Sequence, residues 1–459
     1  MVLPKMKWAL AIYDIPMSTV RRWEQTTNKF LRSWLGAGHT LSRLCLFSSD
    51  SGVALPIDSL LDTWKVEKCR LQQSYNTTPD TFVRSIEPKV RSGRVWSAEK
   101  DLRSAKRDLE CEAVRGMIQP HSRAGIGFGE WAKPWERMSE KEKEEAVIGR
   151  IKKNIELERE SEYGTLEMQS RWVAWRDVVI AMDLSWNNMF KFGDSLIGFA
   201  LSVVYGTVIT PSLKSKWDEN EEGNCKLCVN NRGTIQHILS GCPVSLQQGR
   251  YTWRHNKVLK QIYDQVLYHV EHRVNNPRRS TKNEGKIKNI EFVGLGKNVV
   301  SALKKKRDYG GMGIMTAAKD WMVVADLDKQ LRFPQEVQVQ TQLRPDLIMY
   351  SNSIKRIIWW ELTCPSEERI SVSHELKLDR YANLQGDCQT AGWSCYNMAI
   401  EVGARGFVAE SLQRAATAIG FRGRAVKKLV REVGQEALHC SKWIYWLSEK
   451  REWETRGVA

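Results

Sequence analysis

Residues 344–381 read RPDLIMYSNSIKRIIWWELTCPSEERISVSHELKLDRY, and this stretch decides the fold of the C-terminal part of the chain. Residues 354–364 are rich in β-branched and aromatic side chains and stop at Pro365, a composition that predicts a buried strand. A shorter strand is predicted over residues 343–350, with Pro345 at its entry, where a missing N–H is tolerated. Residues 373–384 have helical spacing. We therefore predict a hairpin that is followed by a helix.

The second predicted strand carries one carboxylate among apolar side chains. Alternate residues of a strand share a face, so Trp359, Glu361 and Thr363 are expected on the same side of the sheet. Burying an unpaired carboxylate is costly, and Glu361 therefore needs a cation, a metal ion or a hydrogen-bond network beside it. The hairpin would bring Asp346 next to Glu361, and two carboxylates can hold Mg²⁺ while leaving positions for water and phosphate.

The predicted helix places His374, Lys377, Leu378 and Tyr381 on one face, at positions i, i+3, i+4 and i+7. A lysine on a core-facing stripe is unusual, because lysine is seldom buried without a partner. The residues alone leave two interpretations open. Lys377 either forms a structural ion pair with Glu361 or takes part in catalysis.

These residues resemble the PD-(D/E)xK nuclease core, and more closely the restriction-like endonuclease domain at the C-terminal end of some non-LTR retrotransposon polyproteins. The resemblance consists of Arg344-Pro345-Asp346, Glu361-Leu362-Thr363, and Lys377 followed four residues later by Tyr381. It implies DNA cleavage, with Asp346 and Glu361 binding Mg²⁺ or Mn²⁺, Lys377 orienting or activating the attacking water, and Tyr381 supporting the site. In the ExK pattern the lysine lies on the strand, two residues after the glutamate, and Thr363 occupies that position here. In the retrotransposon family the lysine lies on a helix instead, and Lys377 matches this helical lysine.

A second motif lies upstream, where Cys225, Cys228, His237 and Cys242 form a CxxC…HxxxxC array. Three sulfur ligands and one nitrogen ligand at this spacing are typical of a tetrahedral Zn²⁺ site. The alternatives are buried free thiols with a solvated histidine, or a disulfide, which the scattered remaining cysteines and the expected lack of a secretory signal disfavour. The same retrotransposon family carries a CCHC motif just before its nuclease, and residues 254–259, RHNKVL, also resemble the segment on the C-terminal side of that motif in the family.

Near the N-terminus, residues 6–16 and 19–36 resemble the helical thumb that follows a reverse transcriptase palm. Apolar residues recur there at helical spacing, namely Val20, Trp23, Phe30 and Leu31, with Trp34 and Leu35. An ordinary amphipathic helix is the alternative to a thumb that grips nucleic acid. The sequence contains no Tyr-x-Asp-Asp motif, so we do not expect a reverse transcriptase from this chain by itself. The polymerase part of the parent element is then an expected partner.

The charge of the chain favours a nucleic-acid partner, DNA or RNA. Lys and Arg number 70 against 54 Asp and Glu, which gives a net charge of +16. Residues 272–307 contain eleven Lys or Arg against Glu284 and Glu291, and this segment ends in Lys304, Lys305, Lys306 and Arg307. We predict that these last four residues contact phosphates. A solvated linker is the alternative.

We expect a multi-domain protein that is mainly α in its N-terminal and middle regions and ends in an α/β domain with a mixed sheet. The expected segments are a thumb-like region over 1–90, a helical connector over 91–215, a zinc knuckle over 216–262, a basic linker over 263–320 and an endonuclease-like domain over 321–459. Residues 97–161 are predicted to form a solvated helix pair, and residues 195–210, which lack charge, a core helix.

Two functions fit these motifs and this charge. The first is a Mg²⁺-dependent endonuclease of retrotransposon origin that nicks DNA, with structural Zn²⁺ in the knuckle. The second is a catalytically inactive, transposon-derived protein that only binds nucleic acid. No membrane span is expected, and a nuclear location is favoured over a cytoplasmic one.

Overall fold

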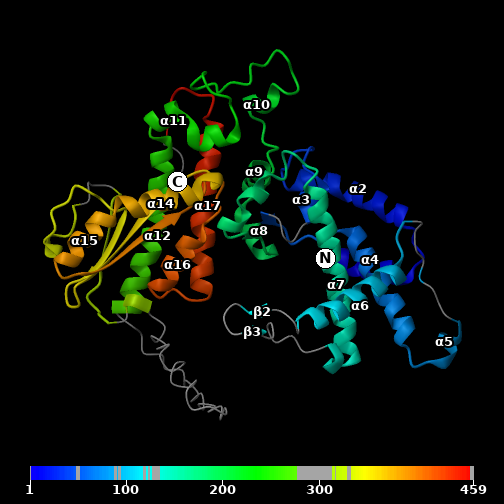
Figure 1. The fold of residues 1–459 in the computed structure, drawn as a ribbon. Coiled ribbons are helices and arrows are strands. Elements are labelled where there is room, and N and C mark those ends of the chain that lie inside the picture. Colours follow the sequence, from blue (N-terminus) through cyan, green and yellow to red (C-terminus); the bar gives the residue numbers. More distant parts are fainter. Residues whose placement is uncertain are drawn as a thin grey trace, which may run out of the picture. The chain divides into compact units, whose positions relative to one another are not determined.

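The computed structural model describes residues 2–47, 52–86, 90, 95–116, 120–121, 125–126, 135–275, 313–315, 317–327 and 332–454 (Figure 1). The chain forms two compact units. The first comprises residues 1–171 with 183–207, and the second comprises residues 172–182 with 208–459. The first unit is helical, whereas the second contains the four-stranded sheet and the cysteine and histidine residues of the CCHC motif. The expected helical N-terminal part and the mixed sheet of the C-terminal part are therefore confirmed.

The first unit is built from helices of very different lengths, with short strands between some of them. In chain order its elements are α1 (Val2–Ile12), α2 (Met17–Trp34), α3 (Arg43–Phe47), β1 (Val53–Ala54), α4 (Leu60–Thr77), α5 (Thr81–Ile86), α6 (Ala98–Gly116), β2 (Pro120–His121), β3 (Gly125–Ile126), η1 (Trp135–Arg137), α7 (Glu140–Tyr163), α8 (Trp186–Phe192) and α9 (Asp194–Val204).

The long helices α6 and α7 belong to the core of the first unit. Leu102 of α6 and Val147, Ile148 and Ile151 of α7 are buried in one cluster with Trp64 of α4. The expected helix pair over residues 97–161 is present as α6 and α7, but the expectation that it is solvated is wrong, because each helix contributes apolar side chains to this core. The N-terminus of α7 is closed by a capping box between Ser139 and Glu142, as its Ser-x-x-Glu sequence favours.

Helix α2 forms where it was predicted, but its buried face differs from the predicted apolar stripe. Trp23, Phe30 and Trp34 are exposed by 38%, 55% and 69%, whereas Val20, Glu24 and Asn28 are buried. Glu24 faces the start of α4, where its Oε2 accepts hydrogen bonds from the Ser59 hydroxyl at 2.5 Å and the Leu61 N–H at 2.9 Å. A carboxylate is stabilised at a helix N-terminus by the free N–H groups, and this contact turns a polar residue inward.

The predicted core helix near residue 200 is confirmed as α9, in which Ile197, Ala200 and Leu201 are buried. None of the helices in the described part of the chain combines the length and the apolarity that crossing a bilayer requires.

The second unit surrounds its sheet with helices. In chain order its elements are η2 (Arg171–Ala174), η3 (Arg176–Val178), α10 (Pro211–Lys214), η4 (His237–Gly241), α11 (Pro243–Gln247), α12 (Arg250–His269), η5 (Val270–Asn275), η6 (Gly313–Met315), β5 (Met322–Ala325), η7 (Gln335–Val337), β6 (Leu347–Ser351), β7 (Arg356–Thr363), η8 (Glu367–Arg369), α14 (Ile370–Arg380), α15 (Ala382–Thr390), β8 (Ser394–Glu401), α16 (Glu410–Ala418) and α17 (Arg424–Trp446); β4 (Met182–Asp183) lies at the boundary between the units.

The sheet has the strand order β5-β6-β7-β8, and only β7 and β8 are parallel. The predicted hairpin is confirmed, because β6 and β7 are antiparallel with Leu347 opposite Trp360. The first strand of the hairpin begins at Leu347 rather than at residue 343. The predicted helix over 373–384 is split at Tyr381, which lies between α14 and α15.

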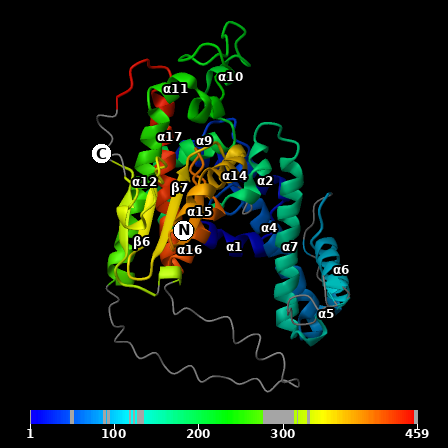
Figure 2. The same cartoon turned by 60° about the vertical axis from the view of Figure 1, so that its left-hand side comes forward.

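Two apolar layers cover the two faces of the sheet. Figure 2 shows β6 and β7 beside α12, α15 and α17. On one face Ile358, Trp360 and Leu362 of β7 pack with residues of α12, α16 and α17. On the other face Ile357 and Trp359 pack with Tyr381 and with residues of α15. Burial on both faces explains the nearly continuous apolar run of β7, and the alternation predicted for residues 359–364 is confirmed.

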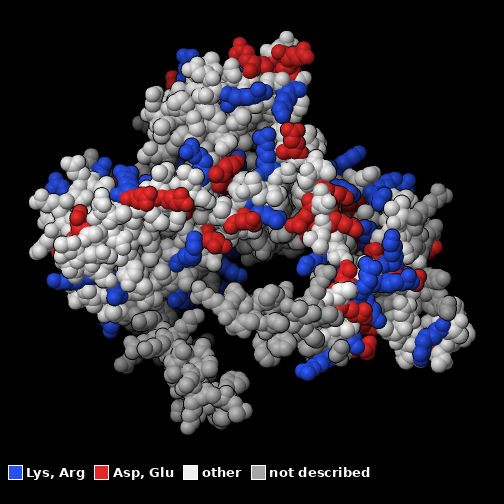
Figure 3. Space-filling model, viewed as in Figure 1, with Lys and Arg blue, Asp and Glu red and all other residues white. Residues whose placement is uncertain are grey.

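Charged side chains of both signs are interspersed on the face of the molecule drawn in Figure 3. Among the described residues on that face, no large area carries Lys and Arg alone. The predicted phosphate-binding residues Lys304, Lys305, Lys306 and Arg307 lie outside the described residues.

Candidate functional site

The hairpin brings Asp346 and Glu361 together at the end of the sheet. Asp346 directly precedes β6, and the antiparallel register that pairs Leu347 with Trp360 places Asp346 opposite Glu361. The Asp346 N–H donates to Glu361 Oε2 at 3.3 Å, and the Leu362 N–H donates to Asp346 Oδ2 at 2.7 Å. Each carboxylate is thus held by a backbone N–H of the opposite side of the hairpin, and the predicted meeting of Asp346 with Glu361 is confirmed.

Lys377 and Tyr381 reach the same place from α14 and its C-terminal end. The Lys377 ammonium donates to Glu361 Oε1, and the Tyr381 hydroxyl donates to the Arg344 carbonyl at 3.1 Å. Glu361 is only 3% exposed. Burial raises the pKa of Glu361, the negative charge of Asp346 raises it further, and the Lys377 charge opposes both effects. The four residues that the sequence singled out therefore form one cluster.

The pair of carboxylates is suited to a hard divalent cation such as Mg²⁺, which takes oxygen ligands. The geometry of this site supports that fit. Two carboxylates lie side by side, Glu361 buried and Asp346 partly buried, and the negative charge of Asp346 contributes to the raised pKa of Glu361. A cation between them would remove this repulsion.

Sequence reasoning missed His255 as a member of this cluster. This residue comes from α12, and its Nε2 lies 3.3 Å from Asp346 Oδ2 and 3.2 Å from the Leu362 carbonyl oxygen. Burial opposes protonation of the ring, but the hydrogen bond to Asp346 and the charge of Asp346 outweigh that effect and raise the pKa of His255. The only signal for His255 in the sequence is its place in the RHNKVL stretch after the CCHC motif.

A second polar network lies at the end of β8, beside the first. Glu401 is 1% exposed, and its Oε1 lies 3.0 Å from His374 Nδ1 while its Oε2 accepts from the Ser411 hydroxyl at 2.6 Å. Glu401 pairs with Thr363 in the parallel register of β7 and β8. No motif singled out Glu401, because its neighbours come from α14 and α16 only in the folded chain.

The four residues of the CCHC motif form one cluster that can hold a metal ion such as zinc. The ligand atoms of Cys225, Cys228, His237 and Cys242 all lie within 4.8 Å of one another. The Cys225 and Cys242 sulfurs are 3.9 Å apart, and Cys228 Sγ lies 3.3 Å from His237 Nε2. A tetrahedral ion with metal–sulfur bonds of about 2.3 Å separates two sulfurs by roughly 3.8 Å, so the separation of Cys225 and Cys242 fits.

Protonation of the Cys225 thiol opposes metal binding. Burial raises the pKa of the Cys225 thiol to about 11 and lowers the pKa of His237. A cation must displace the thiol proton, whereas the histidine is already biased towards the neutral form that binds metals.

The cluster is packed onto the unit that contains the sheet. Tyr251 accepts a hydrogen bond from the Cys242 N–H at 3.0 Å and donates to the Ile238 carbonyl at 2.9 Å. Ile238 and Leu239 are buried with Ala404 and with Ile444 of α17. The CCHC segment is therefore part of the same compact unit as the carboxylate cluster.

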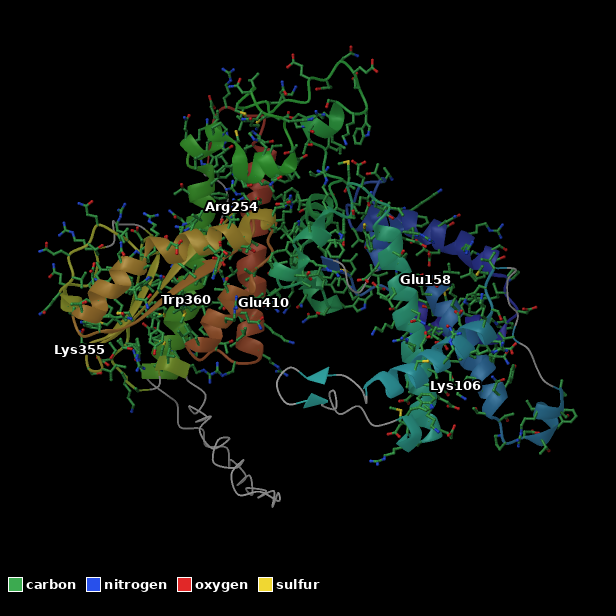
Figure 4. All side chains as sticks on the ribbon, in the orientation of Figure 1. Lys106, Glu158, Arg254, Lys355, Trp360 and Glu410 are labelled. Carbon is green, nitrogen blue, oxygen red and sulfur yellow. The ribbon has the colours of Figure 1, made fainter. Side chains whose placement is uncertain are left out.

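Arg254 connects the CCHC segment, α17 and the end of β7 through hydrogen bonds. The residue is 1% exposed, and its guanidinium donates to the Leu239 carbonyl at 2.9 Å, the Ser441 hydroxyl at 3.0 Å and the Cys364 carbonyl at 3.0 Å. Those three acceptors belong to the CCHC segment, α17 and the end of β7. Figure 4 labels Arg254 on α12, Trp360 in β7 and Lys355 at the hairpin turn, and Arg254 lies at the end of the sheet that is distant from that turn.

Comparison with protein-family models and with curated proteins finds no match to this chain.

Proposed function

We propose that this protein is a metal-dependent DNA endonuclease of retrotransposon origin that nicks one strand. The observation that carries this proposal is the convergence of Asp346, just before β6, with Glu361 of β7 and Lys377 of α14 at one end of the sheet. Two neighbouring carboxylates and a cationic side chain suit phosphodiester hydrolysis, in which negative charge develops on the phosphate.

Each residue of the cluster has a distinct proposed role. Asp346 and Glu361 would hold Mg²⁺ or Mn²⁺, which when bound polarises the phosphate and lowers the pKa of a bound water. Lys377 orients the attacking water and stabilises the charge that develops on the phosphate, because its ammonium already lies at Glu361. Tyr381 holds the Arg344 carbonyl and so fixes the chain just before Asp346.

The remaining parts have proposed roles in binding. Zn²⁺ in the CCHC cluster is structural, since all four positions of the tetrahedron are filled by protein ligands. The basic segment that ends in Lys304–Arg307 contacts phosphates of DNA or RNA. A polymerase from the same element is the proposed protein partner, and the nucleus, where chromosomal DNA lies, is the proposed location.

One observation favours a second candidate, a nucleic-acid-binding protein without nuclease activity. The Lys377 ammonium pairs directly with Glu361, and such a pair can serve stability alone.

Incubation of the purified protein with supercoiled plasmid, with and without Mg²⁺ or Mn²⁺, tests the proposal. We expect relaxed circles only in the presence of the metal, and none from Asp346→Asn. Asp264→Asn is a matched control, because Asp264 is a half-exposed carboxylate of α12 that pairs with Lys260. Equal relaxation by wild type and Asp346→Asn would reject the nuclease, whereas metal-independent DNA binding without any relaxation would favour the second candidate.

A further inference from the structure

His255 belongs to the carboxylate cluster and follows Arg254, the residue that bonds the CCHC segment. Its Nε2 faces two acceptors at once, Asp346 Oδ2 at 3.3 Å and the Leu362 carbonyl at 3.2 Å. Its Nδ1 lies 3.2 Å from Asn256 Oδ1. Both ring nitrogens thus have oxygen neighbours, and these contacts restrict the orientation of the ring.

The sheet holds the Asp346 side chain through one backbone donor, the Leu362 N–H of β7. The β6 ladder begins at Leu347, so Asp346 stands one residue before the ladder. Its Oδ2 is fixed by the Leu362 N–H from β7 and by the His255 ring from α12. Removing the ring leaves only the backbone donor, and the carboxylate gains freedom to rotate.

His255 itself is held by its neighbour in the sequence. Arg254 is buried and bonded to the CCHC segment through Leu239, to α17 through Ser441 and to the end of β7 through Cys364. The first turns of α12 are therefore fixed between the CCHC cluster and the sheet. The fixed position of α12 therefore determines the distance between His255 Nε2 and Asp346 Oδ2.

We propose that His255 is a positioning residue of the nuclease site, which holds Asp346 Oδ2 in the orientation that a divalent cation requires. This inference rests on the proposed nuclease function. Groups that hold metal ligands in place without touching the metal commonly change metal affinity or activity by about 10–100-fold when they are removed.

Two substitutions separate positioning from simple packing. His255→Leu keeps most of the volume but has no donor, whereas His255→Gln keeps an N–H group at about the distance of Nε2. We expect His255→Leu to weaken Mn²⁺ binding, measured by electron paramagnetic resonance, by about 10–100-fold, and to slow single-turnover nicking. His255→Gln should recover a large part of both losses.

His269→Gln is the matched control. His269 lies on the same helix, is also largely buried, and has its Nε2 3.4 Å from a backbone carbonyl, that of Ile419, with no contact to a carboxylate in the described structure. We expect wild-type Mn²⁺ affinity from this variant at pH 7.5. Melting temperature and zinc content, measured on every variant, normalise each result to folded, zinc-loaded protein.

The outcomes distinguish this inference from the nuclease proposal. If wild type binds Mn²⁺ and loses it in Asp346→Asn, while His255→Leu retains wild-type affinity, the positioning role is rejected and the nuclease site stands. If wild type has no Mn²⁺ binding that depends on Asp346, the proposed function itself is rejected. If His255→Leu does not fold, His255→Gln is compared with the shorter His255→Asn, and equal Mn²⁺ affinity in these two variants rejects the positioning role.

Discussion

At the scale of single residues, the environment of each charged side chain decides what its removal costs. Lys377 pairs with Glu361, which is buried beside a second carboxylate. Arg405 pairs with Glu367, which has no exposed side-chain surface. The Lys377 pair has two possible roles. For the Arg405 pair, whose described ion pairs are to Glu367 and Glu368, we expect a structural role.

Lys377→Ala tests which role the first pair has. We expect the variant to bind Mn²⁺ and to nick plasmid at least about 100-fold more slowly in single-turnover experiments, because the lysine acts on the water and the phosphate. Lys428→Ala, which removes an exposed lysine of α17, serves as the control. A lower melting temperature with an unchanged rate per folded molecule would assign Lys377 to stability alone.

Arg405→Leu should destabilise the protein by about 3–5 kcal/mol, because it leaves the buried Glu367 carboxylate without its cation. The Arg405 guanidinium lies 2.7 Å from Glu367 Oε2 and 3.0 Å from Glu368 Oε1. The exposed pair of Lys260 and Asp264 gives the comparison, since Lys260→Ala should cost less than about 1 kcal/mol. Urea unfolding of both variants measures the difference, and equal losses would contradict the expectation.

At the scale of elements, α12 and the CCHC segment are joined by hydrogen bonds. The N-terminal half of α12 contacts the CCHC segment and the sheet through Arg254, and its last residue, His269, stacks on Phe421 with ring centroids 4.2 Å apart. Both ends of α12 therefore carry polar side chains that are buried only because the helix is docked.

The burial of His269 at the C-terminal end of α12 predicts that the stability of the protein depends on pH. Burial lowers the pKa of His269, and the positive charges of Arg273 and Arg422 lower it further. The hydrogen bond to the Ile419 carbonyl raises the pKa but does not outweigh these effects. The unfolded ring takes up a proton at a pH of about 6.5, so below that pH the unfolded chain binds more protons and the folded state loses stability. We expect the melting temperature of His269→Gln to fall less than that of wild type between pH 7.5 and pH 5.5. An equal fall in both proteins would contradict this origin.

The CCHC segment should lose its fold together with its metal. We expect about one zinc per chain in the wild type by elemental analysis and none in Cys228→Ser, with a lower melting temperature because Ile238 and Leu239 lose their packing against Ile444. Cys111→Ser replaces an exposed cysteine and should keep the zinc. Full zinc retention in Cys228→Ser would reject the cluster as a four-ligand site.

At the scale of the whole molecule, the net charge of +16 is the feature that bears on binding. The Lys304–Arg307 cluster is the densest basic run in the segment between the CCHC motif and the sheet. If these four side chains contact phosphates, each contact releases counterions, and the binding constant then depends steeply on salt.

Replacing Lys304–Arg307 with alanine should weaken DNA binding for every sequence alike. The slope of log K against log salt concentration should become shallower by about 0.9 for each lost phosphate contact. The matched control replaces Lys100, Arg103, Lys106 and Arg107 of α6, which removes the same charge from exposed positions of the first unit; Figure 4 labels Lys106. Equal changes in both variants would mean that only total charge matters.

The sequence by itself determined the hairpin, the meeting of Asp346 with Glu361 and the gathering of the four CCHC ligands. These features depend on strand alternation and on short spacings, which local backbone geometry translates directly into position. The side of α14 that carries Lys377 was determined in the same way by helical periodicity.

Only the tertiary structure decided the positions of His255, Glu401 and Glu24. His255 is 91 residues from its partner Asp346, and Glu24 is 35 residues from Ser59, so no local pattern marks either contact. In α2 the side that carries Glu24 faces the protein, because Glu24 forms hydrogen bonds at the start of α4. Trp23 and Phe30, which were expected to be buried, are therefore exposed. Local periodicity fixes which residues share a face, whereas the docking of one element on another decides which face is buried and which polar groups find partners there.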